Sequence, residues 1–174
     1  EYTRTSYYMR KFMGNFSSAT EYSNGYHLWV IFRYAEILLN YAEAQNEYLD
    51  APSQEVYDAL IQLRKRVAIP AGTDRLYGLK ANMTKEEMRE AIQNERRIEM
   101  AFEEQRYWDI RRWRIAEDVF RNPLKGMSIV KNLTSVVYTE VDVLTVNFEE
   151  RRYLYPLPYS EVIKNSRMIQ NPGW

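Results

Sequence analysis

The densest run of charged side chains lies between Asn94 and Arg106, and it contains two glutamates one helical turn apart. Glu95 and Glu99 are four positions apart, so on an α-helix they lie on the same side. Two neighbouring carboxylates can serve as a general acid and a general base. We favour a structural pair held by core arginines, because the carboxylates of glycosidases usually come from separate elements that flank a cleft.

Glu95 falls inside the apolar face of the helix that this segment predicts. That face is formed by Met88, Ala91, Ile92, Ile98 and Phe102. A carboxylate on such a face needs a partner, because an unpaired buried charge is strongly destabilising. We therefore expect Glu95 to be largely buried and bound to an arginine or to backbone N–H groups. Arg33, Arg106 and Arg111 are the candidate partners.

Basic and aromatic residues are interleaved from Trp108 to Arg114, as on some nucleic-acid-binding surfaces. The chain has 24 Lys+Arg and 24 Asp+Glu residues, however, so its formal net charge is zero. A nucleic-acid-binding domain would carry a basic excess. We favour a helix with its tryptophans buried and its arginine stems lying along apolar surface, and we predict no nucleic-acid partner.

His27 is the single histidine, and the chain has no cysteine. These counts exclude disulfides and thiolate metal sites, and they argue against a multi-histidine zinc site or a histidine-paired nucleophile. His27 is expected to cap a helix or to be solvated. No glycine-rich phosphate loop, G-x-S-x-G or H-E-x-x-H pattern occurs. We therefore predict no catalytic residue, no metal site and no cofactor.

The elements that must position these residues are mostly helical. Residues 1–26 are rich in turn formers and predict a loop, with at most a short strand around Tyr7–Phe12. From Leu28 to Tyr48 apolar residues recur at helical spacing. The opposite flank of that helix would carry a polar stripe, which consists of Arg33, Glu36, Asn40 and Glu43.

Ser53 follows a proline and is a good N-cap for a second amphipathic helix, which ends near Val67. Two such helices joined by a short loop predict an antiparallel hairpin over residues 28–68. Its length is close to the unit of helical-repeat proteins, and a single unit does not bury a continuous core. This suggests that further units lie outside this segment.

The remaining chain alternates between helical and extended patterns. Thr84 and Glu87 form a capping-box signature that opens a helix expected to run to about Gln105. A second helical stretch follows over residues 107–120. A short strand or extended loop is predicted at 136–143, an extended segment at 153–158 and a brief helix at 161–164. The fold class is therefore mainly α, with an irregular C-terminal segment and a short β-element.

Three stretches occur in an order and at separations that resemble one family. The first runs from Phe32 to Ala44. The second contains Asn94-Glu95-Arg96-Arg97-Ile98-Glu99, Phe102-Glu103, Arg106, Trp108-Asp109 and Arg111-Arg112-Trp113. The third contains Leu154-Tyr155-Pro156-Leu157-Pro158, Glu161 and the closing Gln170-Asn171-Pro172-Gly173-Trp174. Together they resemble the C-terminal part of the SusD/RagB outer-membrane nutrient-binding lipoproteins of Bacteroidetes.

The resemblance implies a helical scaffold with TPR-like hairpins, one of them matching residues 28–68. It implies that residues 1–174 are a C-terminal domain of a longer protein, whose lipid anchor is absent from this chain. Many relatives carry glycine where this chain has Glu104, so the helix is expected to be straighter here. The motif residues are expected to be scaffold; these are Arg33, Glu36, Glu95, Arg96, Glu99, Arg106, Trp108, Asp109, Asn171 and Pro172.

The resemblance further implies a non-catalytic lipoprotein, exposed at the surface of the outer membrane, that captures a glycan or another nutrient. The ligand would pass to a SusC-like TonB-dependent transporter, and the lipid anchor would be the only membrane contact. Aromatic rings can carry the C–H faces of sugars. Among the 15 tyrosines, the candidates in loops are Tyr22, Tyr26 and Tyr77.

Two other function classes remain open from the sequence. One is a helical-repeat module that binds protein along a groove lined by the polar stripe of the first helix. The other is a carboxylate-based glycoside hydrolase. The fragment interpretation also predicts an exposed apolar patch or an oligomer that covers it. The C-terminal tail is expected to be docked, with Trp174 packed on the helical body.

Overall fold

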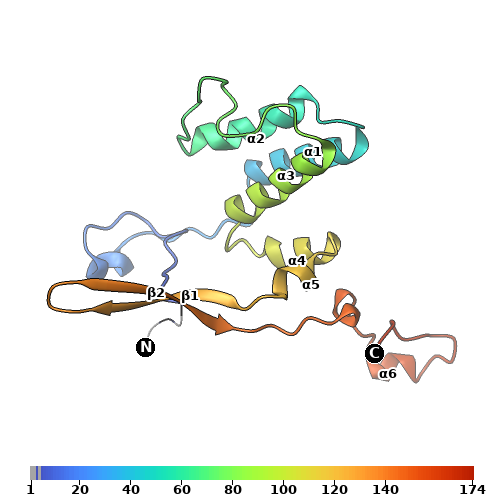
Figure 1. Cartoon of the computed structure of the whole chain (residues 1–174). Helices are drawn as coiled ribbons and strands as arrows, with labels where there is room; N and C mark the ends of the chain where they lie inside the picture. The colour runs from blue at the N-terminus through green and yellow to red at the C-terminus, as the bar shows by residue number, and fades with distance from the viewer. Residues whose placement is uncertain (1–2, 4) are drawn as a thin grey trace. The chain divides into compact units, whose positions relative to one another are not determined.

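The computed structural model describes Thr3 and residues 5–174, except for the side chains of Ala19, Tyr22 and Asn24. The chain forms two compact units, Phe12–Arg106 and Glu1–Lys11 with Tyr107–Trp174. Helices are the main secondary structure of the described residues, with a small two-stranded sheet (Figure 1). The predicted fold class, mainly α with a short β-element, is confirmed.

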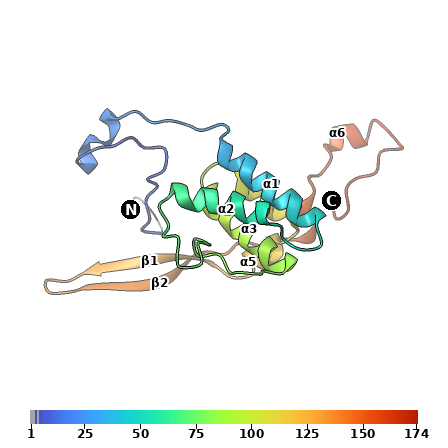
Figure 2. The same ribbon diagram turned by 90° about the horizontal axis from the view of Figure 1, so that it is seen from above.

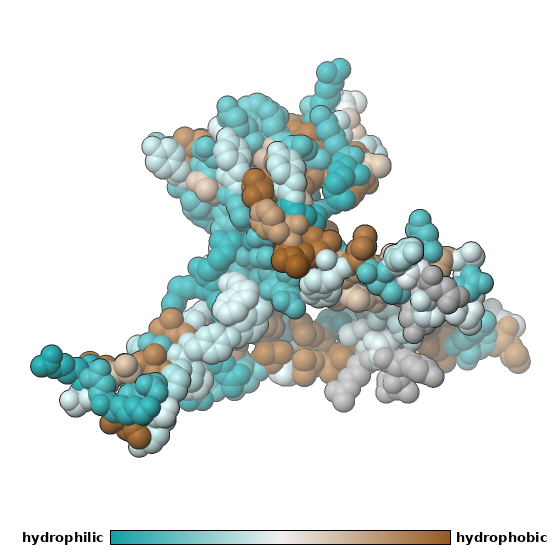
Figure 3. All heavy atoms as spheres, turned by 180° about the vertical axis from the view of Figure 1, so that it is seen from behind, coloured by the Kyte–Doolittle hydropathy of each residue, from teal (hydrophilic) through white to brown (hydrophobic). Residues whose placement is uncertain are grey.

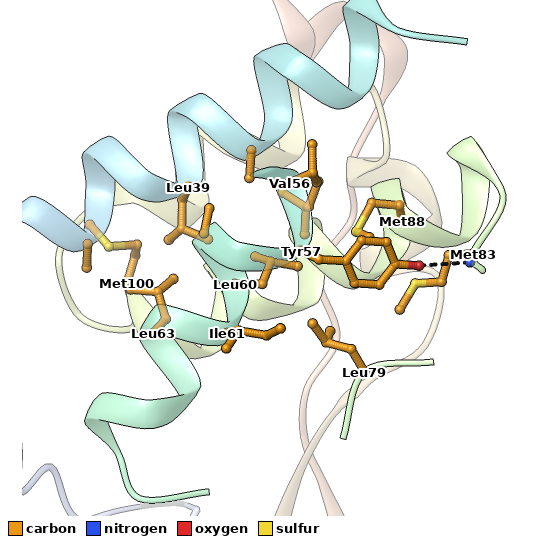
Figure 4. Packing of buried hydrophobic residues seen from close by; sticks show 14 residues of the cluster. Leu39, Val56, Tyr57, Leu60, Ile61, Leu63, Leu79, Met83, Met88 and Met100 are labelled. Atoms are coloured by element: carbon orange, nitrogen blue, oxygen red, sulfur yellow. Dashed lines mark hydrogen bonds between the residues drawn. The ribbon is translucent and has the colours of Figure 1, made fainter. Parts of the chain in front are cut away.

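The unit Phe12–Arg106 contains three long helices, α1 (Tyr34–Tyr48), α2 (Gln54–Arg66) and α3 (Lys85–Glu99). α1 packs against both α2 and α3, and Figure 2 shows the three helices together from above. Their apolar faces meet in one core (Figure 4), in which Leu39, Val56, Leu60, Met88 and Ile92 are fully buried. The hairpin pattern of the sequence thus forms α1 and α2, with α3 completing the core.

α1 begins at Tyr34 and not at Leu28, so the predicted start of this helix is wrong. Arg33 is extended, with φ −151° and ψ 160°. Just before it, His27 forms a β-bridge with Met13, and Leu28 donates a backbone hydrogen bond to Phe12. His27 therefore caps no helix, because its segment is held as extended chain, and the residue is exposed, as the other predicted alternative has it.

The link from α2 to α3 is fixed by one buried tyrosine and a capping box. The hydroxyl of Tyr57 accepts a hydrogen bond from the Met83 backbone at 2.9 Å, and it lies 3.3 Å from the Lys80 carbonyl (Figure 4). Thr84 and Glu87 form the predicted capping box at the start of α3. Hydrogen bonds from Lys80 and from the Thr84 backbone lower the pKa of Glu87.

α3 ends at Glu99, and the expectation of a straight helix to Gln105 is wrong. Phe102 and Glu104 adopt left-handed backbone conformations, with φ 63° and 62°. The chain turns there and re-enters helix as α4 (Gln105–Arg112), which is followed by α5 (Ala116–Phe120). The turn therefore forms with a glutamate at position 104, in a backbone conformation that glycine adopts most readily.

The other unit is built around an antiparallel hairpin of β1 (Leu124–Lys131) and β2 (Val136–Leu144). β2 confirms the predicted extended segment, whereas β1 was not predicted. After the hairpin come the 3₁₀ helix η2 (Glu150–Tyr153) and the short helix α6 (Tyr159–Val162), which begins two residues before the predicted helix. Among its described residues, the N-terminal segment holds the Met13–His27 bridge and the 3₁₀ helix η1 (Ala19–Asn24). Residues 7–12 form no strand, in agreement with the predicted loop.

Candidate functional site

In the unit Phe12–Arg106, which we call the helical unit, the densest polar cluster is centred on Arg33, just before α1. Its Nε and Nη2 donate to the two carboxylate oxygens of Glu103 at 2.8 and 2.7 Å, and its Nη1 donates to Glu99. The Glu103 side chain is only 4% exposed. Burial lowers the pKa of Arg33, but its hydrogen bonds to Glu103 and Glu99 outweigh burial and raise it. The cluster ties the segment before α1 to the turn after α3.

Glu99 is shared between two arginines. Besides Arg33, Arg66 at the end of α2 donates to both carboxylate oxygens, at 2.6 and 2.8 Å. One carboxylate of α3 thus joins the start of α1 to the end of α2. Charge-assisted hydrogen bonds of this kind fix geometry as well as contributing energy.

Glu95 is paired with an arginine, as predicted, but the partner is Arg64 of α2 and not Arg33, Arg106 or Arg111. Arg64 donates through Nε and Nη2 to one oxygen of Glu95, at 3.0 and 2.8 Å. The two side chains are 16% and 13% exposed. The third donor of the guanidinium, Nη1, binds the carbonyl of Tyr77 at 2.9 Å, so the pair also holds the α2–α3 loop.

Arg96 belongs to the second of the three sequence motifs, and it binds a residue of the first motif, which runs from Phe32 to Ala44. It is almost fully buried, and it donates to Asn40 of α1 at 2.7 Å and to Gln105 of α4 at 3.1 Å. Asn40 is therefore bound to Arg96, and Arg33 is bound to Glu99 and Glu103, although Arg33 also lines a hollow on the helical hairpin. The polar stripe predicted for a protein-binding module is instead partly bound to residues of α3 and the turn that follows it.

The two candidate acid–base carboxylates thus have structural partners. Glu95 is bound to Arg64, and Glu99 is bound to Arg33 and Arg66. An acid–base pair must reach a substrate with its carboxyl oxygens, whereas one oxygen of Glu95 and both oxygens of Glu99 accept hydrogen bonds from guanidinium groups. The arrangement favours the scaffold interpretation of this segment.

The C-terminal tail, residues 170–174, is docked on the segment 151–157. The Gln170 side chain donates to the Leu157 carbonyl at 2.8 Å and accepts from the Leu157 N–H at 2.7 Å. Asn171 donates to the Tyr155 carbonyl at 2.6 Å. Trp174 donates through Nε1 to the carbonyl of Arg151 at 3.0 Å. The tail is docked as expected, but on the segment 151–157 rather than on the helical body.

The remaining motif residues have varied surroundings. Asp109 is buried and accepts a hydrogen bond from Arg112 at 2.9 Å, and the N–H of Glu36 donates to the Arg33 carbonyl in the first turn of α1. Arg106 is half-buried, and Pro172 lies at the surface. Trp108 is 56% exposed, so the interpretation that buries it is wrong.

Trp108 belongs to an exposed aromatic cluster that the sequence analysis missed. Its ring lies 5.0 Å from that of Tyr107 and 6.3 Å from that of Tyr155. The hydroxyls of Tyr107 and Tyr155 are hydrogen-bonded to each other. The guanidinium of Arg111 lies 3.5 Å from the centre of the Tyr107 ring. Periodicity could not reveal this cluster, because Tyr155 is 48 positions from Tyr107.

Two hollows in the described residues could accept a small ligand. One lies on the helical hairpin, has a volume of about 430 Å³ and is mainly apolar; its lining residues are Arg33, Tyr34, Ala35, Leu38, Gln62, Leu63 and Arg66. The other lies beside the docked tail and has a volume of about 340 Å³; its lining residues are Arg114, Glu150, Arg151, Tyr153, Leu154, Pro172 and Gly173. Both volumes are at the lower end of the range for ligand sites.

The tyrosines predicted to carry sugar have different environments. Tyr26 is 91% exposed. Tyr77 is half-buried against the helical core, with the Lys65 ammonium 5.3 Å from its ring centre. The Tyr22 side chain lies outside the described residues, although its backbone is part of η1. The ligand-binding role of these three residues stays a prediction.

The described residues contain no helix that is both long enough and apolar enough to cross a bilayer. Within the same residues, no group of three or more histidine, cysteine, aspartate or glutamate side chains is arranged to hold a metal ion.

Comparison with family models places the whole chain in one family. The model described as "SusD family" matches residues 1–174. Among curated proteins, the "SusD-like protein P2" of Formosa agariphila is 34% identical over 149 residues, which are 84% of this chain and 26% of that protein. The "SusD-like protein P38" of the same organism is 27% identical, over 82% of this chain and 24% of that protein.

Solved structures give the same result. The crystal structure of a SusD-like protein from Bacteroides fragilis superposes with a TM-score of 0.70 and 35% identity, covering 86% of this chain and 26% of that one. A SusD homolog from Bacteroides thetaiotaomicron gives a TM-score of 0.60 and 28% identity, covering 86% and 28%. The chain thus spans about a quarter of the length of the relatives it matches.

Proposed function

This chain belongs to the SusD family, and from that premise we propose that it is part of a cell-surface protein that binds a glycan or another nutrient without transforming it. The observation that carries the proposal is the match of the family model to all 174 residues. The ion pairs of the helical unit support it, because Arg33, Arg64 and Arg66 bind the glutamates that a hydrolase would need.

The proposal includes the place and the partner of the whole protein. We propose that residues 1–174 are the C-terminal domain of a longer lipoprotein on the outer face of the outer membrane, with residues 28–68 as a TPR-like hairpin within it. A lipid anchor elsewhere in that protein would hold it to the membrane. A SusC-like TonB-dependent transporter would receive the ligand.

One observation supports a different function, namely binding of protein through the helical hairpin. α1 exposes apolar side chains on the face turned away from its core. They follow helical spacing and consist of Tyr34, Ile37, Tyr41 and Tyr48. Such a face is typical of a helix that packs on another helix. A protein-binding module therefore remains the alternative that the experiment must separate from ligand capture.

The test is calorimetry with the full-length lipoprotein and a panel of soluble glycans, together with analysis of the products. We expect binding at micromolar to millimolar dissociation constants, because a few stacked rings on an open surface gain little after the costs of ordering. Released reducing ends that are lost in Glu95→Gln would establish a hydrolase. Tight binding to a protein other than a transporter, with no glycan bound, would establish the interaction module.

A further inference from the structure

The hollow beside the docked tail is formed by one compact unit. Its volume is about 340 Å³, which suits one ring-sized molecule. Arg114 follows α4, four lining residues lie at positions 150–154 in η2 and just after it, and Pro172 and Gly173 belong to the tail. All of these positions fall in the unit that contains Tyr107–Trp174. The shape of the hollow therefore follows from the described residues alone.

Arg114 occupies a backbone position at which glycine is the usual residue. Just after α4, the N–H of Ile115 donates to the carbonyl of Ile110 at 3.0 Å, and the N–H of Arg114 donates to the carbonyl of Arg111 at 3.0 Å. These two hydrogen bonds form the Schellman motif, in which Arg114 holds the left-handed position. Its φ is 55°, a conformation that strains a residue with a Cβ. Strained backbone conformations gather at ligand sites, so the arginine side chain needs a role that outweighs the strain.

The side chain of Arg114 is held at the hollow by two contacts. Its guanidinium lies 4.6 Å from the centre of the Tyr153 ring, and it forms an ion pair with Glu150. The two side chains of that pair are 61% and 65% exposed, and ion pairs so exposed add little stability. The pair therefore does not explain the strained arginine as a stabilising contact. It does place hydrogen-bond donors and a carboxylate acceptor together at the hollow.

The docked tail forms another wall of the hollow, and a glycine allows it to come close to η2 (Figure 1). Gly173 has a φ of 84°, and a Cβ there would lie 2.7 Å from the Cβ of Arg151. The Trp174 Nε1 donates to the Arg151 carbonyl at 3.0 Å, which fixes the tail at this place. Since Pro172 and Gly173 line the hollow, its full shape depends on the docking of the tail.

We propose that this hollow binds one neutral sugar ring of a glycan, with Arg114 and Glu150 on its hydroxyl groups and with Leu154 and Pro172 beside its C–H groups. The proposal rests on the proposed function, which supplies the glycan as ligand. A sugar hydroxyl both donates and accepts a hydrogen bond, and the guanidinium and the carboxylate offer the complementary groups side by side. The apolar lining residues suit the C–H groups of the ring, as in small-ligand sites generally.

Other small ligands fit the hollow less well. Arg114 is paired with Glu150, and Arg151 is paired with Glu149 at 2.7 Å. The charges at the hollow are therefore balanced, and an anion would have to compete with Glu150 for Arg114. A purely apolar ligand would remove water from that ion pair without replacing its hydrogen bonds. A side chain from another part of the longer protein is the remaining rival occupant.

The test measures glycan binding of the full-length lipoprotein by calorimetry and its stability by urea denaturation, with Arg114→Gly and Glu150→Gln as variants. Arg114→Gly removes the guanidinium and supplies the residue that the Schellman motif favours, so we expect its stability to be equal or higher. We expect each variant to bind the glycan about tenfold more weakly or less, as after the loss of a hydrogen bond to a charged group. Arg152→Ala is the matched control, because Arg152 is exposed in η2 and does not line the hollow.

The outcomes separate this inference from the proposed function. Weaker glycan binding in both variants, with the stability of Arg114→Gly retained and the control normal, supports the sugar site. Unchanged glycan binding in Arg114→Gly overturns it and leaves the proposed function standing; a loss of stability in the same variant would assign the hollow to another part of the protein. Stronger binding of acidic glycans in Glu150→Gln overturns the neutral class of ligand. A wild-type protein that binds no glycan removes the proposed function and this inference together.

Discussion

At the scale of single residues, the charged side chains of the sequence motifs bind one another. Arg33 pairs with Glu99 and Glu103 across 66 and 70 positions, and Arg64 pairs with Glu95 across 31 positions. Removing one partner of such a buried pair leaves an uncompensated charge, which costs more than the pair itself contributes. Glu95 and Glu99 of α3 are therefore tied to the start of α1 and to α2 by these ion pairs.

Glu95→Ala tests this directly. The variant leaves the guanidinium of Arg64, 16% exposed, without its carboxylate, and we expect the free energy of unfolding to fall by about 3 kcal/mol or more. Urea denaturation provides the measurement. Glu90→Ala is the control, because Glu90 lies on the exposed face of the same helix. Equal stability of the two variants would contradict a structural role for Glu95.

Glu104→Gly is expected to stabilise the protein. Glu104 has a φ of 62°, a conformation that costs a residue with a Cβ about 1–2 kcal/mol. Glycine removes this strain but loses more chain entropy on folding, so we expect the free energy of unfolding to rise by about 0.5–1 kcal/mol. Gln93→Gly within α3 should instead destabilise by about 1 kcal/mol. A loss of stability in Glu104→Gly would show that the glutamate side chain contributes more than the strain costs.

At the scale of elements, local signals and tertiary contacts decide different boundaries. α3 begins where its capping box predicts, because Thr84 and Glu87 satisfy each other's backbone N–H groups. Its end and the start of α1 do not follow the apolar periodicity. Arg33 lies just before α1 and Glu103 lies in the turn after α3. The ion pair between them fixes the extended segment at the first boundary and the turn at the second. Caps are local, whereas these two boundaries depend on a pair 70 positions apart.

Thr84→Ala should cost about 1 kcal/mol, the usual effect of losing an N-cap side chain. Ser53→Ala is the matched comparison, because Ser53 is the N-cap residue of α2 but its side chain makes no capping hydrogen bond to a backbone N–H of the helix. We expect Ser53→Ala to lower the free energy of unfolding by clearly less than Thr84→Ala does. Thermal unfolding followed by circular dichroism would measure both. A larger loss for Ser53→Ala would refute the assignment of the stabilising cap to α3.

At the scale of the whole molecule, much apolar surface is open to solvent. Figure 3 shows apolar residues, in brown, on the surface of the molecule. The exposed large side chains include Tyr34 and Ile37 of α1, Trp108 of α4 and Leu133 of the hairpin. Scattered exposed apolar residues are normal, but several side chains aligned on one helix face favour a partner that covers them.

The chain expressed by itself should therefore associate or bind a hydrophobic dye. We expect sedimentation velocity to show species larger than the 20.9 kDa monomer, or 8-anilinonaphthalene-1-sulfonate fluorescence well above that of the full-length protein. Tyr34→Glu and Tyr41→Glu on the exposed face of α1 should reduce either signal. Tyr26→Glu, at a still more exposed tyrosine outside the helices, is the control. A strictly monomeric chain without dye binding would count against the fragment interpretation.

The sequence by itself determined those features of the fold that depend on residues close together in the chain. The mainly helical class, α2, the capping box of α3 and the extended β2 all follow from spacing and turn chemistry within a few positions. The motifs were also enough to identify the family. The need for a partner beside Glu95 followed from the cost of burying an unpaired charge. The docking of the tail followed from the cost of exposing a tryptophan to water.

Only the tertiary structure decided which groups meet. Arg64 rather than Arg33 binds Glu95, Trp174 docks on residues 151–157, and Tyr107 and Tyr155 join in one cluster. β1 was hidden because a strand of a two-stranded ribbon is defined by its pairing with β2 more than by its own pattern. The three side-chain contacts join residues 23 to 48 positions apart, and the spacing of residues along the chain does not reveal which distant groups meet.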